Sequence, residues 1–151
     1  MYMSKPILVE AEVIKTPDGV LMPVYKDWEE WHGGYEVKMV YCTTIAPNTS
    51  KGPILHEQRR GLMTCIQGDV SVTCLVDGVL QNFKLTDKAK KYTLIIPKNM
   101  PNLITNHSTD TEAILLNLPD RSWHPEDQDT QKFLSWEDYF KKQNTSTAVE
   151  K

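Results

Sequence analysis

The feature that most constrains the fold is the alternation of side chains in residues 70–76, where valine, valine, cysteine and valine are each separated by one residue. A period of two is typical of a β-strand whose two faces meet different surroundings. Asp77-Gly78 follows at once, and this pair is a strong signal for a β-hairpin. Residues 79–85 are then predicted to return as the second strand. The sequence therefore indicates antiparallel β-structure at its centre.

The rest of the chain shows short segments rich in branched and aromatic residues, separated by turn-forming residues. Further strands are predicted at residues 7–14, 20–25, 36–45, 62–66, 92–96, 101–105 and 112–118, with a loop or short helix at 27–35 and a loop at 47–53. Only the end changes character: Ser135 is a suitable N-cap followed by acids, which predicts a short helix through Lys142. Many short strands and one late helix predict an all-β sandwich or barrel.

Length and charge narrow the class of protein. The 151 residues fit one domain, predicted at residues 1–143, with 144–151 as a flexible C-terminal tail. The formal net charge of −3 argues against nucleic acid or an anionic membrane as the main partner, because both are bound by an excess of Lys and Arg.

Localisation is predicted from the apolar segments and the cysteines. No apolar run approaches the roughly 20 residues needed to cross a bilayer, and residues 1–6 lack the order of a secretion signal. Cys42, Cys65 and Cys74 are an odd number of cysteines within apolar stretches. They are interpreted as buried thiols, which indicates a reducing cytoplasm.

His56 ends a short apolar stretch and is the first candidate for chemistry. A histidine in such a place is more often structural than catalytic, but its surroundings resemble a known family. His56-Glu57-Gln58 is similar to the first motif of the dTDP-4-dehydrorhamnose 3,5-epimerase branch of the cupins. Residues 62–70, 123–127 and 134–138 resemble, in the same order, that family's Gly-acid-Val hairpin, its aromatic-x-Pro-Glu-Asp segment and its late Trp followed by acids.

The resemblance implies a cupin (jelly-roll) β-barrel with a short C-terminal helix and no metal or other cofactor. A metal-binding cupin shows His-x-His, a following Glu and a later His. Here Gln58 occupies the second position and Asn102 stands where the late His is expected. One His and one Glu do not complete a His-rich metal site.

Length and the segment from residue 40 to His56 also resemble the sister group of dTDP-4-keto-6-deoxyhexose 3,4-ketoisomerases. Both reactions remove a proton from a carbon beside a ketone, and the resemblance makes His56 the base. It implies that Asp138, or Glu137, orients this histidine, although acids at that place also suit a helix N-terminus. Tyr41 is the candidate acid by likeness to the ketoisomerases, with packing on a strand as the alternative.

A further set of side chains is predicted to bind the substrate: Gln58, Arg59, Arg60, Asn102, Asn117 and Trp28. Either arginine suits a diphosphate, since guanidinium binds phosphate oxygens in pairs, and both also make ordinary surface charges. Asn102 is expected to bond a sugar oxygen. Trp28 is expected to stack on a base or sugar, or else to cap the barrel or form a dimer contact.

Together these features predict a cytoplasmic epimerase or ketoisomerase acting on a dTDP-4-keto-6-deoxy sugar, in deoxysugar and polysaccharide biosynthesis such as that of O-antigen lipopolysaccharide. The alternative is a non-catalytic cupin that binds a sugar nucleotide. Asn117, Gly61 and Asn102 favour this alternative, because each removes a group that could move a proton or stabilise charge. Asn117 and Gly61 stand where the epimerases carry their acid tyrosine and a lysine that supports the enolate, and Asn102 stands where a late His is expected. A homodimer is predicted through the edge strand at residues 7–14, since a bare strand edge is hazardous.

Overall fold

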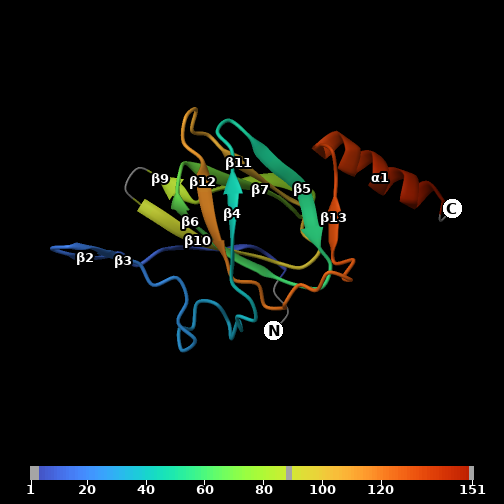
Figure 1. The fold of residues 1–151 in the computed structure, drawn as a ribbon. Helices are drawn as coiled ribbons and strands as arrows, with labels where there is room; N and C mark the ends of the chain where they lie inside the picture. The colour runs from blue at the N-terminus through green and yellow to red at the C-terminus, as the bar shows by residue number, and fades with distance from the viewer. Residues whose placement is uncertain (1–3, 88–89, 150–151) are drawn as a thin grey trace.

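Two antiparallel sheets face each other in the computed structural model, which describes residues 4–87 and 90–149 (Figure 1). The first sheet has the order β1 (Ile7–Glu10), β10 (Lys90–Ile96), β6 (Gly61–Gln67), β12 (Ala113–Asn117) and β4 (Tyr41–Ile45), and β9 (Thr86–Asp87) pairs with β10. The second has the order β13 (Thr130–Lys132), β5 (Ser50–His56), β11 (Asn102–Asn106), β7 (Val70–Val76) and β8 (Val79–Lys84). The predicted all-β architecture is confirmed.

The core lies between the two sheets and follows from the alternation seen in the sequence. Val70, Val72 and Cys74 of β7 are at most 1% exposed and pack with side chains from the facing sheet. The main apolar cluster comprises Ile45, Met63, Cys65, Val70, Val72, Cys74, Val76, Leu85, Leu94, Ile96, Met100, Ile104, Ala113 and Leu115. The turn after β7 has Asp77 and Gly78 at positive φ, as the predicted hairpin requires.

Three predicted strands are several residues shorter in the structure, and the loop predicted at residues 47–53 is cut short by β5, which begins at Ser50. The strand expected at residues 7–14 is divided into β1 and β2 (Ile14–Thr16), because the chain leaves β10 after Ala11 donates its N–H to Lys91 O. The strand expected at 20–25 ends with β3 (Gly19–Leu21), and the one expected at 36–45 begins only at β4. In Figure 1 the β2–β3 hairpin extends away from the body of the molecule.

The C-terminal helix is longer than predicted. Helix α1 (Trp136–Val149) begins after Ser135, whose Oγ accepts the N–H of Asp138, so the predicted N-cap is confirmed. The helix passes the predicted end at Lys142 and continues through most of the segment expected to be a flexible tail. Among the described residues, no helix has the length and apolar character needed to span a membrane.

Gly68, in the tight turn between β6 and β7, has φ of +105°, and a Cβ there would lie 2.8 Å from Ala113 Cβ. Gly78 also has positive φ, but a Cβ there meets nothing within 4 Å. We expect Gly78→Ala to cost about 1 kcal/mol of unfolding free energy through backbone strain. Gly68→Ala should cost about 3 kcal/mol, because the collision adds to the strain. Urea denaturation measures both, and equal costs would contradict this packing.

Candidate functional site

A cavity of about 100 Å³ opens between the two sheets, with walls from β4, β5, β6, β11 and β12. The polar side chains that line it are Tyr41, Thr43, Lys51, His56, Arg59, Asn102 and Asn117. A wider hollow of about 540 Å³ lies around Gly68 and Asp69, lined by Ser71, Lys84 and His107. We place the candidate site in the smaller cavity, because it is lined by a possible base (His56), a possible acid (Tyr41) and a cation (Arg59).

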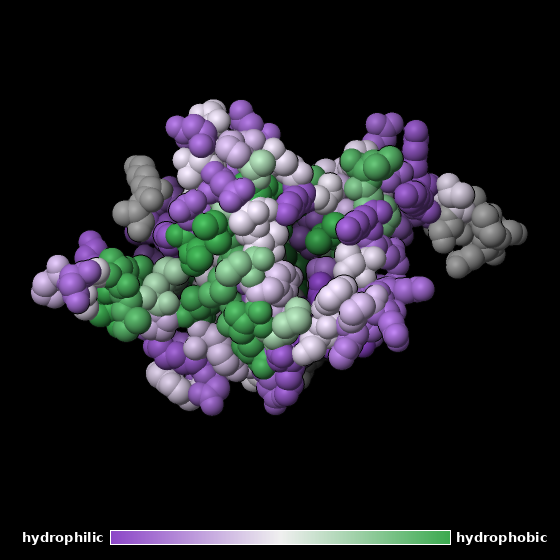
Figure 2. All heavy atoms as spheres, in the orientation of Figure 1, coloured by the Kyte–Doolittle hydropathy of each residue, from purple (hydrophilic) through white to green (hydrophobic). Residues whose placement is uncertain are grey.

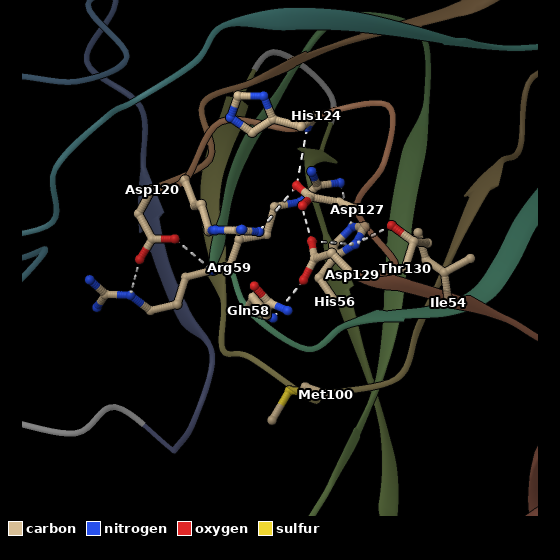
Figure 3. Close-up of polar contacts among 12 residues, drawn as sticks. Ile54, His56, Gln58, Arg59, Met100, Asp120, His124, Asp127, Asp129 and Thr130 are labelled. Carbon is tan, nitrogen blue, oxygen red and sulfur yellow. Dashed lines mark hydrogen bonds and ion pairs between the residues drawn. The ribbon is translucent and has the colours of Figure 1, made fainter.

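His56 is the last residue of β5, and its side chain is 18% exposed. Its Nε2 lies 3.4 Å from Arg59 Nη2, and its Nδ1 lies 3.0 Å from Thr130 Oγ1 (Figure 3). A guanidinium only donates hydrogen bonds, so Nε2 accepts from Arg59 and Nδ1 carries the proton that is donated to Thr130. Thr130 is opposite His56 in the β13–β5 register. The short strand β13 therefore sets the orientation of the imidazole.

The carboxylate beside His56 belongs to Asp129, which is 1% exposed. Its Oδ1 accepts the N–H of Gln58 at 2.6 Å. Its Oδ2 lies 3.3 Å from Arg59 Nε and 3.8 Å from His56 Nδ1. Among the buried side-chain polar atoms of the described residues, Oδ2 of Asp129 is the one without a hydrogen bond. This oxygen therefore faces both the Arg59 guanidinium and the His56 imidazole without being fully satisfied by either.

The surroundings set the protonation of the two groups suited to proton transfer. Burial, with a further contribution from the Arg59 guanidinium, lowers the pKa of His56 to about 4, against the opposing effect of Asp129. His56 is therefore neutral at pH 7 and able to accept a proton. Burial raises the pKa of Tyr41, and Arg59 opposes that shift. Tyr41 therefore keeps its proton at neutral pH and is able to donate it.

The structure brings several predicted residues together in the cavity, namely Tyr41, His56, Arg59, Asn102 and Asn117. The two asparagines are 4% and 7% exposed. The side-chain nitrogen of Asn102 donates to Ile54 O, and that of Asn117 donates to Thr43 Oγ1. Gln58 takes part through its backbone N–H, which binds Asp129, while its side chain is exposed.

Other predicted residues lie elsewhere. Asp138 is on α1, where Oδ2 accepts the N–H of Leu134 at 2.9 Å and pairs with Lys142 at 3.2 Å, while Asp129 takes the place beside His56. Arg60 binds Asp120 through both its backbone N–H and its Nε. Trp28 is 73% exposed under the ammonium group of Lys26, away from the residues that line the cavity.

A groove of about 350 Å³ continues outward from the cavity, lined by Met39, Tyr41, Arg59 and Trp123. Tyr41 and Arg59 line both spaces, so the cavity and the groove meet at these two side chains. The loop that carries Trp123 is closed by Asp127, whose Oδ2 accepts the N–H of His124. Trp123 is half exposed on this groove, an arrangement suited to stacking on a flat ring.

Sequence reasoning assigned no role to Asp129, Thr130 or Met39, and used Trp123 only as part of a motif. The strand that carries Thr130 has the polar sequence Thr-Gln-Lys, which shows no strand pattern. Among the described residues, no group of three or more His, Cys, Asp or Glu is arranged to hold a metal ion.

The two facing antiparallel sheets have the fold of RmlC-like cupins such as the rmlC epimerase of Mycobacterium tuberculosis, with a TM-score of 0.68 at 13% identity over 86% of this chain and 69% of that one. The family model described as "FdtA: WxcM-like, C-terminal" matches residues 6–138, and the chain belongs to this family. No curated protein sequence matches the chain.

Solved structures with the same fold include sugar-nucleotide enzymes. A dTDP sugar isomerase from Desulfovibrio desulfuricans G20 has a TM-score of 0.72 at 14% identity, covering 84% of this chain and 82% of that one. The 3,4-ketoisomerase QdtA from Thermoanaerobacterium thermosaccharolyticum, in complex with TDP, has a TM-score of 0.68 at 16% identity over 92% and 96% of the chains. A 3,4-ketoisomerase from Helicobacter canadensis has a TM-score of 0.71 at 15% identity over 94% and 99%.

Asp129→Asn and Asp138→Asn make the same chemical change at the two carboxylates. We expect Asp129→Asn to lower the free energy of unfolding by about 3 kcal/mol, since it leaves the buried Arg59 without its counter-charge. Asp138→Asn should unfold at nearly the same urea concentration as the wild type, because exposed ion pairs contribute little. Chemical denaturation distinguishes them. A larger loss for Asp138→Asn would contradict the assignment.

Proposed function

We propose that this protein is a 3,4-ketoisomerase that acts on a dTDP-4-keto-6-deoxy sugar without a cofactor. The observation that carries the proposal is a neutral His56 and a protonated Tyr41 in one cavity with the cation of Arg59. The family and the two ketoisomerases that match almost end to end support it. The non-catalytic alternative has less support, because these structural relatives are enzymes.

The proposed reaction is two proton transfers on neighbouring carbons. His56 Nε2 takes the proton from C3 beside the C4 ketone, which leaves an enediolate with its charge on the C4 oxygen. Lys51, the other cation that lines the cavity, stabilises that charge. Tyr41 delivers a proton to C4 while the proton on O3 passes to O4, so the product has its ketone at C3 and a hydroxyl at C4. The proton held by His56 then returns to Tyr41 through solvent. Return of a proton to C3 from the opposite face gives an epimer instead, so epimerisation is the second candidate. Tyr41 in the cavity and Asn117 at the epimerase tyrosine position favour isomerisation.

The cavity and the outer groove suggest how a sugar nucleotide lies in the site. The sugar enters the cavity beside His56, the diphosphate passes Arg59 where the two spaces meet, and the nucleobase stacks on Trp123. Arg59 lines both spaces whereas Arg60 lines neither, so Arg59 is the better diphosphate ligand of the pair.

We further propose a cytoplasmic homodimer that supplies deoxysugars for polysaccharides such as O-antigen lipopolysaccharide. Cys65 and Cys74 are buried as predicted, whereas Cys42 is exposed and that prediction was wrong; all three are free, which is consistent with a reducing compartment. The β2–β3 hairpin supports a dimer, because it extends from the body and carries hydrophobic side chains on its surface (Figure 2). Two of its side chains, Val20 and Leu21, are 64% and 59% exposed. A second copy of the chain is the proposed cover for these side chains.

The reaction itself is tested by hydrogen exchange. Incubation with dTDP-4-keto-6-deoxyglucose in D₂O, followed by NMR, should show loss of the C3 proton and a product with its ketone at C3. His56→Gln should slow exchange by about 100-fold or more, because general base catalysis is removed. Asn106→Ala is unsuitable as a control, since the buried side-chain amide donates hydrogen bonds to three backbone carbonyls and its loss would disturb the fold. His124→Gln is suitable, since that ring is exposed.

The pattern of exchange separates the alternatives. Exchange at C3 with the ketone retained at C4 supports a single epimerase, and exchange at both C3 and C5 supports a double epimerase. Absence of exchange with every 4-keto sugar nucleotide would refute the enzymatic proposal and favour the binding protein.

Trp123→Ala and Trp28→Ala test where the nucleobase lies. Calorimetry should show that dTDP binds Trp123→Ala about 10-fold more weakly, since stacking of one base contributes roughly 1–3 kcal/mol. Trp28→Ala should bind like the wild type, because that ring lies outside both spaces. If dTDP binds Trp28→Ala more weakly and binds Trp123→Ala like the wild type, the nucleobase does not occupy this groove.

A further inference from the structure

In the free protein, the nitrogen that the proposed reaction needs is already engaged. His56 Nε2 accepts a hydrogen bond from Arg59 Nη2 at 3.4 Å, so its lone pair is directed at a cation. Nδ1 is directed at Thr130 Oγ1. Neither ring nitrogen is therefore free to take a proton from a substrate carbon while Arg59 stays in this position.

The anion that holds Arg59 also faces His56. Asp129 Oδ2 is 3.3 Å from Arg59 Nε and 3.8 Å from His56 Nδ1, and it makes no hydrogen bond within the described part of the chain. Its other oxygen is fixed by the N–H of Gln58, so the carboxylate stays where it is when Arg59 moves. If the Arg59 guanidinium moves a short distance away, the His56 imidazole is therefore the remaining partner that faces Asp129 Oδ2.

Arg59 also lies where an anionic ligand passes. It lines both the cavity and the outer groove, and a guanidinium binds phosphate oxygens in pairs. The other ionisable groups that line the two spaces are Tyr41 and Lys51, while Arg60 is paired with Asp120. Arg59 is therefore the cation that a diphosphate meets beside His56.

We propose that a nucleoside diphosphate draws Arg59 away from His56, which frees Nε2 and leaves Asp129 as the counter-charge of His56 alone. The proposal rests on the proposed function and adds that the ligand itself activates the base. In the free protein Arg59 contributes to the low pKa of His56, about 4. With Arg59 withdrawn, Asp129 favours the imidazolium, so the pKa rises and the imidazole becomes a stronger base.

The test is an NMR titration of ¹⁵N-labelled histidine side chains in the full chain, with and without saturating dTDP. The signal of His56 is identified by its loss in His56→Gln. We expect dTDP to raise the pKa of His56 by about one pH unit. Arg59→Gln should show a raised pKa without any ligand and little further change with dTDP. In Asp129→Asn the rise caused by dTDP should be lost.

Two further variants separate the charge of Arg59 from its packing. Arg59→Lys keeps a cation and should keep a lower pKa of His56 than Arg59→Gln does. Arg60→Gln, the neighbouring change at an arginine paired with Asp120, should titrate like the wild type. A purely structural Arg59 would leave the pKa of His56 unchanged in Arg59→Gln, and that result would overturn the proposal.

Kinetics supply a second readout. The pH profile of kcat/KM reports the free protein and should decline only below a pH of about 4, where free His56 becomes protonated. The profile of kcat reports the complex and should decline at a higher pH. If the substrate turns over and dTDP binds, but His56 titrates identically in both states, only the present inference fails. If dTDP does not bind, this inference and the nucleotide assignment fail together.

Discussion

The buried carboxylate of Asp129 is the constraint on which the arrangement of the site depends. It joins the approach to β13 with the turn after β5, because it binds the N–H of Gln58 and faces both Arg59 and His56. A buried charge is tolerated only when it is paired and hydrogen-bonded. The same ion pair that stabilises the turn therefore also places a cation and an anion on either side of one imidazole. Thr130, the next residue, adds the hydrogen bond that orients the ring.

Local patterns predicted most of the barrel but less of its connections. The alternation in residues 70–76 and the turn at Asp77-Gly78 reproduce β7 and its hairpin, because one face of that strand is buried. The break after β1 was not predicted, since apolar residues flank the less strand-prone Glu10-Ala11-Glu12 on both sides and pairing with β10 decides where the strand ends. Strand β13 is polar and exists through its register with β5. No local pattern could have shown it.

The residues of the candidate site were also predicted only in part. His56, Tyr41 and Arg59 stood out by residue type and by resemblance, and the structure gathers them in one cavity. Which acid accompanies the histidine depends on the path of the chain between β12 and α1, and sequence separation does not specify that path. Resemblance implied Asp138, but its carboxylate is occupied at the start of α1. Burial sets the protonation states of these side chains: it keeps the His56 imidazole neutral and the Tyr41 phenol protonated. Proton transfer between neighbouring carbons requires these two states.

The most direct test of this account is a crystal structure of the protein with dTDP bound. We expect the base to stack on Trp123, the diphosphate to bind Arg59, and Asp129 Oδ2 to lie within hydrogen-bonding distance of His56 Nδ1. Binding of dTDP in the hollow around Gly68, with the contact between Arg59 and His56 unchanged, would contradict it.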